Sequence, residues 1–306
     1  MTEPRDEAGG GATTTSGVAG ARVLDIRYTA YADAQPTRAG AIRVLARWSV
    51  LRALGVRRSW TAKLWPYALV ALAFGPGLAV LAVRGLFVSN FGTDELPVDL
   101  LPYGEYLEMI NLVVLVFTAT VVPVLLCPDR RDRVLSLYLS TAASGLDYLA
   151  AKALAAFVLL FAITAPPVLV LFAGNLFFAK DVTGLLAEDA DVLWRAPAAA
   201  ALVSVVYGAL GLAISSLTRR RAFAVGGFLV LMVTTPVLAG ILAASADAGP
   251  SSSWHLLDLA VLPFTLARRV FGEAAGPPTW QLAAVCGALV LGCAALLVVR
   301  YRGDDA

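Results

Sequence analysis

Six long apolar stretches, separated by polar segments, dominate the hydropathy pattern of the chain. They cover approximately residues 66–83, 109–126, 153–174, 198–217, 222–244 and 280–299. A helix of about 20 residues crosses the roughly 30 Å hydrocarbon core of a bilayer. The pattern therefore predicts an all-α integral membrane protein with six transmembrane helices, with residues 66–299 forming one membrane domain.

The segment before the first span divides into two parts. Residues 1–21 mix acids with Gly, Thr and Ala and have no apolar core, so we expect a disordered cytoplasmic tail rather than a signal peptide. Residues 22–65 are expected to form a cytoplasmic or interfacial elbow region. Its sequence RAGAIRVLARWSVLRALGVRRSW predicts an amphipathic helix lying in the membrane plane, with an apolar side and a basic side. The apolar side holds Ile42, Leu45, Trp48 and Leu51, and the membrane-interface residues are expected to be Arg43, Arg47, Trp48 and Arg52.

Composition and charge agree with a membrane protein and suggest its orientation. Hydrophobic residues make up 59% of the 306 residues and charged residues 15%, which excludes an ordinary water-soluble domain. Most of the 24 lysines and arginines precede the first span, follow the second and fourth spans, or lie in the tail at residues 300–306. Positive residues are retained in the cytoplasm, so both termini are expected there. Arg outnumbers Lys, a bias that is typical of GC-rich bacterial genomes but decides nothing physical. We expect a multi-pass protein of the bacterial plasma (inner) membrane.

The polar segment CPDRRDRVLSLYLSTAASGLDYLAAK, which begins at Cys127, carries two helix-start signals. Pro128 is expected to end the second span, and Asp129 to cap a short helix on the membrane face, with Asp132 three residues later. The apolar side of that helix holds Val134, Leu135, Leu137, Tyr138 and Leu139. Ser144 and Asp147 form a second capping box, which predicts the start of the third span.

Two interpretations of the short helix remain open. Arg130, Arg131 and Arg133 could rest on anionic lipid headgroups, which would explain the arginines alone. The alternating acids Asp129 and Asp132 gain nothing from a negative surface, and a helix of mixed charge favours a groove on another protein.

Small residues recur at helical spacing in two spans. The fourth span places Ser204, Gly208, Gly211 and Ser215 on one face, and the sixth places Ala284, Ala288, Gly292 and Ala295 on another. Such faces let a neighbouring helix approach closely. Each face could be an internal seam or a contact between subunits, and for both we favour the internal seam.

Motifs for catalysis or metal binding are missing from the sequence. It contains no phosphate-binding loop, no HExxH and no G-x-S-x-G, and Cys127, Cys286 and Cys293 lie in or beside apolar segments. We therefore expect a non-catalytic chain that binds no metal and no nucleic acid. The stretch around His255 and Asp258 predicts two short amphipathic helices broken at Pro263, with Trp254 and Phe264 at the headgroup level, rather than a hydrolase site.

An interfacial elbow helix, six spans and the loop DRRDRVLSLYLS...LDYLAAK together resemble the membrane subunit of an ABC-2 type transporter, over roughly residues 23–302. The resemblance implies that the loop is a cytoplasmic coupling helix that docks on a separate ATPase subunit, which binds ATP and Mg²⁺. Its coupling residues would be Asp129, Arg130, Arg131, Asp132, Arg133, Leu135 and Tyr138. A second permease chain, identical or different, would complete the translocation path.

The resemblance implies a permease that exports an amphiphilic lipid, peptide or drug-like molecule. No residue of the sequence identifies a substrate contact. An ion-coupled secondary carrier is a first alternative, although no ionisable residue is expected in the middle of a span, where carriers usually bind their coupling ion. A membrane scaffold or sensor partner that does not transport is a second.

Overall fold

The computed structural model describes residues 37–56, 60–91, 101–132, 144–179, 181–246, 249, 252–273 and 276–302. Within these ranges every regular element is a helix, and six segments are long and apolar enough to cross a membrane. For this part of the chain the prediction of an all-α protein is therefore confirmed, as is that of six apolar helices long enough to span a membrane.

The first half of the chain forms one helix in the predicted elbow region and the first two of the segments that could cross a membrane. These elements are α1 (Arg38–Ala53), α2 (Trp60–Phe91), α3 (Tyr103–Met109), α4 (Asn111–Val121) and α5 (Pro123–Arg131). The second span is α4 and α5 together, Asn111–Arg131. It is interrupted at Val122, and Pro123 occupies the first turn of α5, where a missing N–H costs least.

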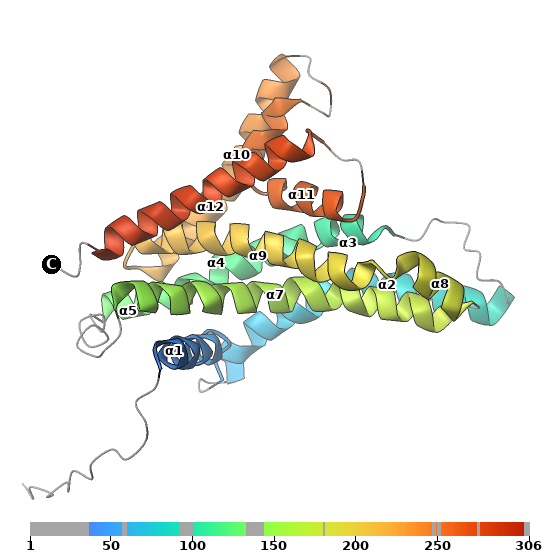
Figure 1. Ribbon diagram of the computed structural model, residues 1–306, viewed down its shortest axis with the longest axis horizontal. Coiled ribbons are helices and arrows are strands. Elements are labelled where there is room, and N and C mark those ends of the chain that lie inside the picture. The colour runs from blue at the N-terminus through green and yellow to red at the C-terminus, as the bar shows by residue number, and fades with distance from the viewer. Residues whose placement is uncertain are drawn as a thin grey trace, which may run out of the picture. The chain divides into compact units, whose positions relative to one another are not determined.

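The second half of the chain forms four further spans and three short helices. They are α7 (Gly145–Phe178), α8 (Val182–Asp189), α9 (Val192–Leu217), α10 (Arg221–Ser245), η1 (Ser253–Leu257), α11 (Leu262–Val270) and α12 (Thr279–Arg302). Figure 1 shows α7 and α9 side by side, with α1 against the first part of α7 and α11 against α9.

The six spans form an inner and an outer set. In the most apolar window of α4–α5 and of α9, 67% of residues are buried, against 17% in α10 and α12. The α7 window is also mostly buried and the α2 window mostly exposed. The outer helices α2, α10 and α12 therefore present apolar faces that water would disfavour and that a bilayer accepts.

Several spans are longer than the hydropathy pattern predicts. Helix α2 continues past Val83 to Phe91, and α7 begins at Gly145 rather than near Ala153. The predicted boundaries stopped at charged residues, whereas the helical hydrogen bonds continue through them. Pro128 does not end the second span either, because α5 runs through it to Arg131.

Two local sequence signals form recognisable helix ends. The predicted Ser144–Asp147 capping box is present: the Asp147 N–H donates to Ser144 Oγ at 3.3 Å, and the Ser144 N–H donates to Asp147 Oδ2 at 3.1 Å. Helix α1 ends at Gly55, whose φ of 70° favours glycine. The Val56 N–H bonds to Leu51 O and the Gly55 N–H to Arg52 O, which is the Schellman pattern.

Helix α1 buries part of one side against the bundle. Ala46 and Ser49 are its buried residues, whereas Trp48 is 49% exposed. The apolar side with Trp48 was predicted to face lipid rather than the bundle, and it stays a prediction. Ser49 and Arg52, three residues apart on one side of α1, supply partners to charged groups of the bundle.

Candidate functional site

A buried ion cluster joins α1, α5 and α7. Asp129 Oδ1 lies 2.5 Å from Arg52 Nη2, and Asp129 Oδ2 lies 2.7 Å from Lys152 Nζ. Tyr148 donates its hydroxyl proton to Asp129 Oδ2 at 2.9 Å, and Lys152 also donates to Ser49 Oγ at 3.0 Å. We call these five residues the Asp129 cluster. Because buried charges are costly unless paired, this geometry fixes the three helices against one another.

The sequence predicted that Asp129 caps a new helix, and this prediction is wrong. Asp129 lies inside α5 and is 1% exposed, and its carboxylate is occupied by the Asp129 cluster. Asp129 was predicted to couple the chain to an ATPase, but it has almost no exposed surface with which to contact a partner. Its partners Arg52 and Lys152 lie 77 and 23 positions away, which local sequence signals do not reveal.

The other predicted coupling residues differ in position. Arg130 turns toward the ends of α9 and α12, where it donates to the Ser216 carbonyl and lies 5.9 Å from the centre of the Tyr301 ring. Arg131 and Asp132 are exposed. Arg133, Leu135 and Tyr138 lie outside the described residues.

Helix α1 makes one ion pair with a residue just before the segment 133–143 and another with a residue just after it. At its start, Arg38 Nε lies 2.7 Å from Asp147 Oδ1, just after that segment. At its other end, Arg52 pairs with Asp129, just before it. The remaining predicted elbow residues Arg43, Arg47 and Trp48 are exposed. Helix α1 therefore links the end of α5 to the start of α7.

The small-residue face of α9 lies inside the bundle. Ser204, Gly208, Gly211 and Ser215 are all buried. A β-carbon on Gly211 would lie 3.0 Å from Val122 Cγ1 of the second span, so the helices approach closely there. By contrast Ala284, Ala288, Gly292 and Ala295 of α12 are exposed. The α9 stripe thus lies inside the bundle, whereas the α12 stripe faces outward and does not form the internal seam favoured for it.

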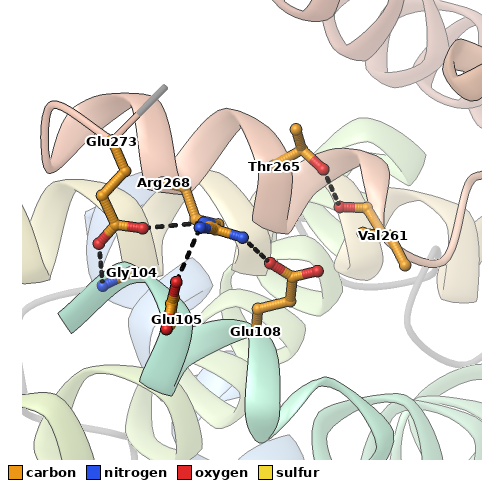
Figure 2. Close-up of polar contacts among 7 residues, drawn as sticks. All are labelled: Gly104, Glu105, Glu108, Val261, Thr265, Arg268 and Glu273. Carbon is orange, nitrogen blue, oxygen red and sulfur yellow. Dashed lines mark hydrogen bonds and ion pairs between the residues drawn. The ribbon is translucent and has the colours of Figure 1, made fainter. Parts of the chain in front are cut away.

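A second ion cluster lies at the opposite end of the bundle, and Figure 2 shows its contacts. Arg268 of α11 donates from Nε to Glu273 at 2.8 Å, from Nη1 to Glu108 at 2.8 Å and from Nη2 to Glu105 at 3.3 Å. Glu273 also accepts the Gly104 N–H at 2.9 Å. We call these four charged residues the Arg268 cluster. It fastens α11 to α3, which precedes the second span.

The segment 252–271 is anchored by protein contacts. Phe264, predicted at the headgroup level, is completely buried and packs edge-on against Tyr207, so that prediction is wrong. Trp254 is exposed as expected. Asp258 accepts the N–H groups of Ala260 and Val261, each at 3.1 Å, and so orders the turn into α11. Burial raises the pKa of Asp258, although these N–H bonds oppose the shift.

A buried arginine near the same end lacks an ionic partner among the described residues. Arg84 is 5% exposed and donates to Asn175 Oδ1 at 3.0 Å. Asn175 donates to the Tyr103 hydroxyl at 3.3 Å, which in turn donates to Asp189 Oδ2 at 3.2 Å. Burial raises the pKa of Tyr103 to about 12. A neutral amide and a phenol thus connect the positive charge of Arg84 to the negative charge of Asp189.

The described residues offer structural and electrostatic contacts. No three His, Cys, Asp or Glu side chains within this part of the chain are placed to hold a metal ion. The sequence interpretation missed Tyr148, Lys152, Arg38, Arg268 and the glutamates that Arg268 contacts. A scan against protein-family models and a search of curated proteins give no match to this chain.

Proposed function

We propose that the chain is a permease subunit of an ATP-driven transporter of the ABC-2 type, and that a separate ATPase subunit drives it through residues 129–139. The observation that carries the proposal is that α1 links the end of α5 to the start of α7. Arg52 is paired with Asp129 before the segment 133–143, and Arg38 with Asp147 after it. A force applied to that segment would therefore move α1, α5 and α7 together.

The second span provides a route from this end of the bundle to the other. It begins beyond the Arg268 cluster at α3 and ends at the Asp129 cluster in α5. The helix breaks at Ile110, just before the span, and at Val122 within it, and we expect α3, α4 and α5 to be the pieces that change angle. ATP binding by the partner would shift the population between two arrangements of these pieces, and thereby change which end of the path is open.

A second permease chain has faces available for close approach. The α12 window is only 17% buried, and its exposed side carries the stripe Ala284, Ala288, Gly292 and Ala295. Small residues permit helices to pack closely in membranes. The translocation path would run between two such chains, which can be alike or unlike.

The cargo fits an amphiphilic molecule, such as a lipid, peptide or drug-like compound. The described spans have apolar walls, and their buried charges Asp129, Lys152 and Arg84 lie toward the span ends. Export into or across the bacterial plasma membrane follows from the family resemblance. Among the described residues, the end that holds α1 also holds most of the basic residues, which supports a cytoplasmic position for that end by the charge rule.

The test is purification of the tagged chain from its native membrane, followed by assay of ATP hydrolysis and of cargo transport in vesicles. The double variant Leu135→Asp with Tyr138→Asp should lose the bound ATPase, or keep ATP hydrolysis while losing transport. A matched control introduces Asp at two exposed apolar residues of α8, Val182 and Leu186. Transport by the purified chain with an ion gradient and no ATPase would establish a secondary carrier instead. A complex that neither hydrolyses ATP nor transports would indicate a scaffold.

A further inference from the structure

A cavity of about 200 Å³ lies beside the Arg268 cluster, between α3, η1, α11 and the start of α12. Its titratable lining residues are Glu108, His255, Asp258 and Arg268, and Leu262 and Leu282 belong to its apolar wall. Pockets for whole drug-sized molecules begin at about 300 Å³. The cavity therefore has room for the polar end of a ligand rather than for a whole one.

Negative charge exceeds positive charge among the described residues around the cavity. Arg268 contacts three glutamates, so the ionised Arg268 cluster holds one cation and three anions. Asp258 adds a fourth acid, and Arg269, which donates to two carbonyls of the cavity wall, adds a second base. The acids still outnumber the bases by two, and protonation of His255 would leave an excess of one. The cavity therefore favours a cation.

Two carboxylate oxygens on lining residues have no hydrogen-bond donor in the described part of the chain. Asp258 accepts the Ala260 and Val261 N–H groups with the same oxygen, Oδ1, which leaves Oδ2 without a donor. Glu108 bonds to Arg268 through Oε2, and Figure 2 shows its other oxygen pointing away from Arg268. Burial raises the pKa of Asp258, and a bound cation would offset that cost by stabilising the charged carboxylate.

The available acceptors suit a primary ammonium group better than a metal ion. No three His, Cys, Asp or Glu side chains of the described residues are placed to hold a metal. A primary ammonium has three N–H donors and one positive charge, so it could donate to both Asp258 Oδ2 and Glu108 Oε1. A quaternary ammonium has the same charge but no N–H group, and it would leave both oxygens without a donor.

Apolar side chains lie on the same elements as the cavity. Leu262 and Leu282 line its wall, whereas Trp254 and Leu257 of η1 and Trp280 at the start of α12 are exposed. Tryptophan is enriched at the boundary between membrane and water. A ligand with an ammonium head and an apolar tail would satisfy both the acidic cavity and this apolar surface.

We infer that this cavity binds the primary ammonium head of an amphiphile, with Asp258 and Glu108 accepting its N–H bonds and its tail along η1 and the start of α12. This differs from general attraction of cations to an acidic surface, because it requires two particular carboxylates. The site needs no ATPase partner, so its test is separate from that of the proposed function.

Binding of a simple amphiphilic amine to the purified full-length chain tests the site. Radiolabelled dodecylamine, which is a primary ammonium at neutral pH, is added to the chain in a non-ionic detergent, and its retention is measured by scintillation proximity. Unlabelled dodecylamine should displace it at lower concentration than dodecyltrimethylammonium, which has the same charge and tail but no N–H group. Equal displacement by these two would overturn the assignment to a primary ammonium.

Two further competitors separate the head of the ligand from its tail. Dodecanol has the tail without the charge, and ethylammonium has the head without the long tail. Each should displace dodecylamine less effectively than unlabelled dodecylamine does. Dodecanol of equal strength would show a purely apolar site, and ethylammonium of equal strength would show a site for small free amines. Either result would overturn the inference.

Variants then locate the binding. Asp258→Asn removes one charge but keeps a side-chain oxygen that can accept the Ala260 and Val261 N–H groups, so the turn into α11 is retained. It should weaken dodecylamine binding roughly five-fold, as expected for the loss of one charge beside the ammonium. Glu105→Gln removes a more exposed acid at the same end, outside the lining, and should change binding by less than about two-fold. Equal effects of the two substitutions would show diffuse attraction and contradict the site.

Discussion

Lys152 Nζ lies 2.7 Å from Asp129 Oδ2, and both side chains are almost completely buried, at 0% and 1% exposed. The pair joins the end of the second span to the start of the third. Arg52 approaches the other carboxylate oxygen, so two cations share one acid. Removing either member of a buried pair leaves an uncompensated charge, which costs more than the pair itself contributes.

Asp129→Asn should therefore destabilise the protein by about 3 to 5 kcal/mol, because Lys152 then remains buried without its counter-ion. Denaturant unfolding in detergent measures the change. Asp132→Asn, at an exposed acid three residues later, should change the free energy of unfolding by less than about 0.5 kcal/mol. The double variant Asp129→Asn with Lys152→Met should be more stable than Asp129→Asn alone. Equal losses for Asp129→Asn and Asp132→Asn would refute the buried pair.

Two glycines of α9 should respond differently to the same substitution. A β-carbon at Gly211 would lie 3.0 Å from Val122 Cγ1 and 3.2 Å from Thr118 Cγ2, whereas at Gly208 the nearest atom is Leu160 Cδ1 at 3.6 Å. Gly211→Ala should cost about 1 to 3 kcal/mol through overpacking. Gly208→Ala should be neutral or slightly stabilising, because alanine favours the helix. Thermal unfolding of the two variants checks this order, and the reverse order would exclude the α9 seam as described.

The sequence predicts features that depend on neighbouring residues and misses those that depend on distant ones. Hydropathy locates the six spans, and the Ser144–Asp147 spacing locates the start of α7, because both signals are local. The burial of Asp129 and Phe264 depends on side chains far along the chain. Asp129 in particular has the sequence context of a helix cap, and only the position of Lys152 and Arg52 in space makes it a buried ion-pair residue.

The Arg268 cluster contains two glutamates that should contribute unequally. Glu273 is 19% exposed, bonds to Arg268 at 2.8 Å and accepts the Gly104 N–H, whereas Glu105 is 47% exposed and lies 3.3 Å from Arg268. Glu273→Gln should cost about 1 to 3 kcal/mol by weakening contacts of partly buried groups. Glu105→Gln should cost less than about 0.5 kcal/mol. Hydrogen exchange of the α3 and α11 amides should increase only for the Glu273 variant, and similar exchange in both would contradict this arrangement.

Asp258 should make stability depend on pH. Burial raises its pKa, with Glu108 acting in the same direction and His255 against it. The folded protein therefore holds this proton to a higher pH than the unfolded chain does. The resulting stabilisation is fully present below the ordinary aspartate pKa of about 3.9 and is lost as pH rises through the raised pKa.

The unfolding temperature of the wild-type chain minus that of Asp258→Asn isolates this effect from other carboxylates. This temperature difference should become more positive as pH falls from about 7 toward about 4, because the wild type gains stability relative to the variant. A difference that is constant over this range, or that moves in favour of the variant, would show that Asp258 is not held in the way described.

Photo-crosslinking from position 138 in intact native membranes tests the central proposal most directly. The chain with Tyr138→p-benzoylphenylalanine is irradiated and its adducts are identified by mass spectrometry, with Leu186→p-benzoylphenylalanine as the control in α8. The proposal predicts a crosslink from position 138, and none from position 186, to a subunit that binds and hydrolyses ATP. Adducts at position 138 with phospholipid alone, or with no protein partner, would contradict it.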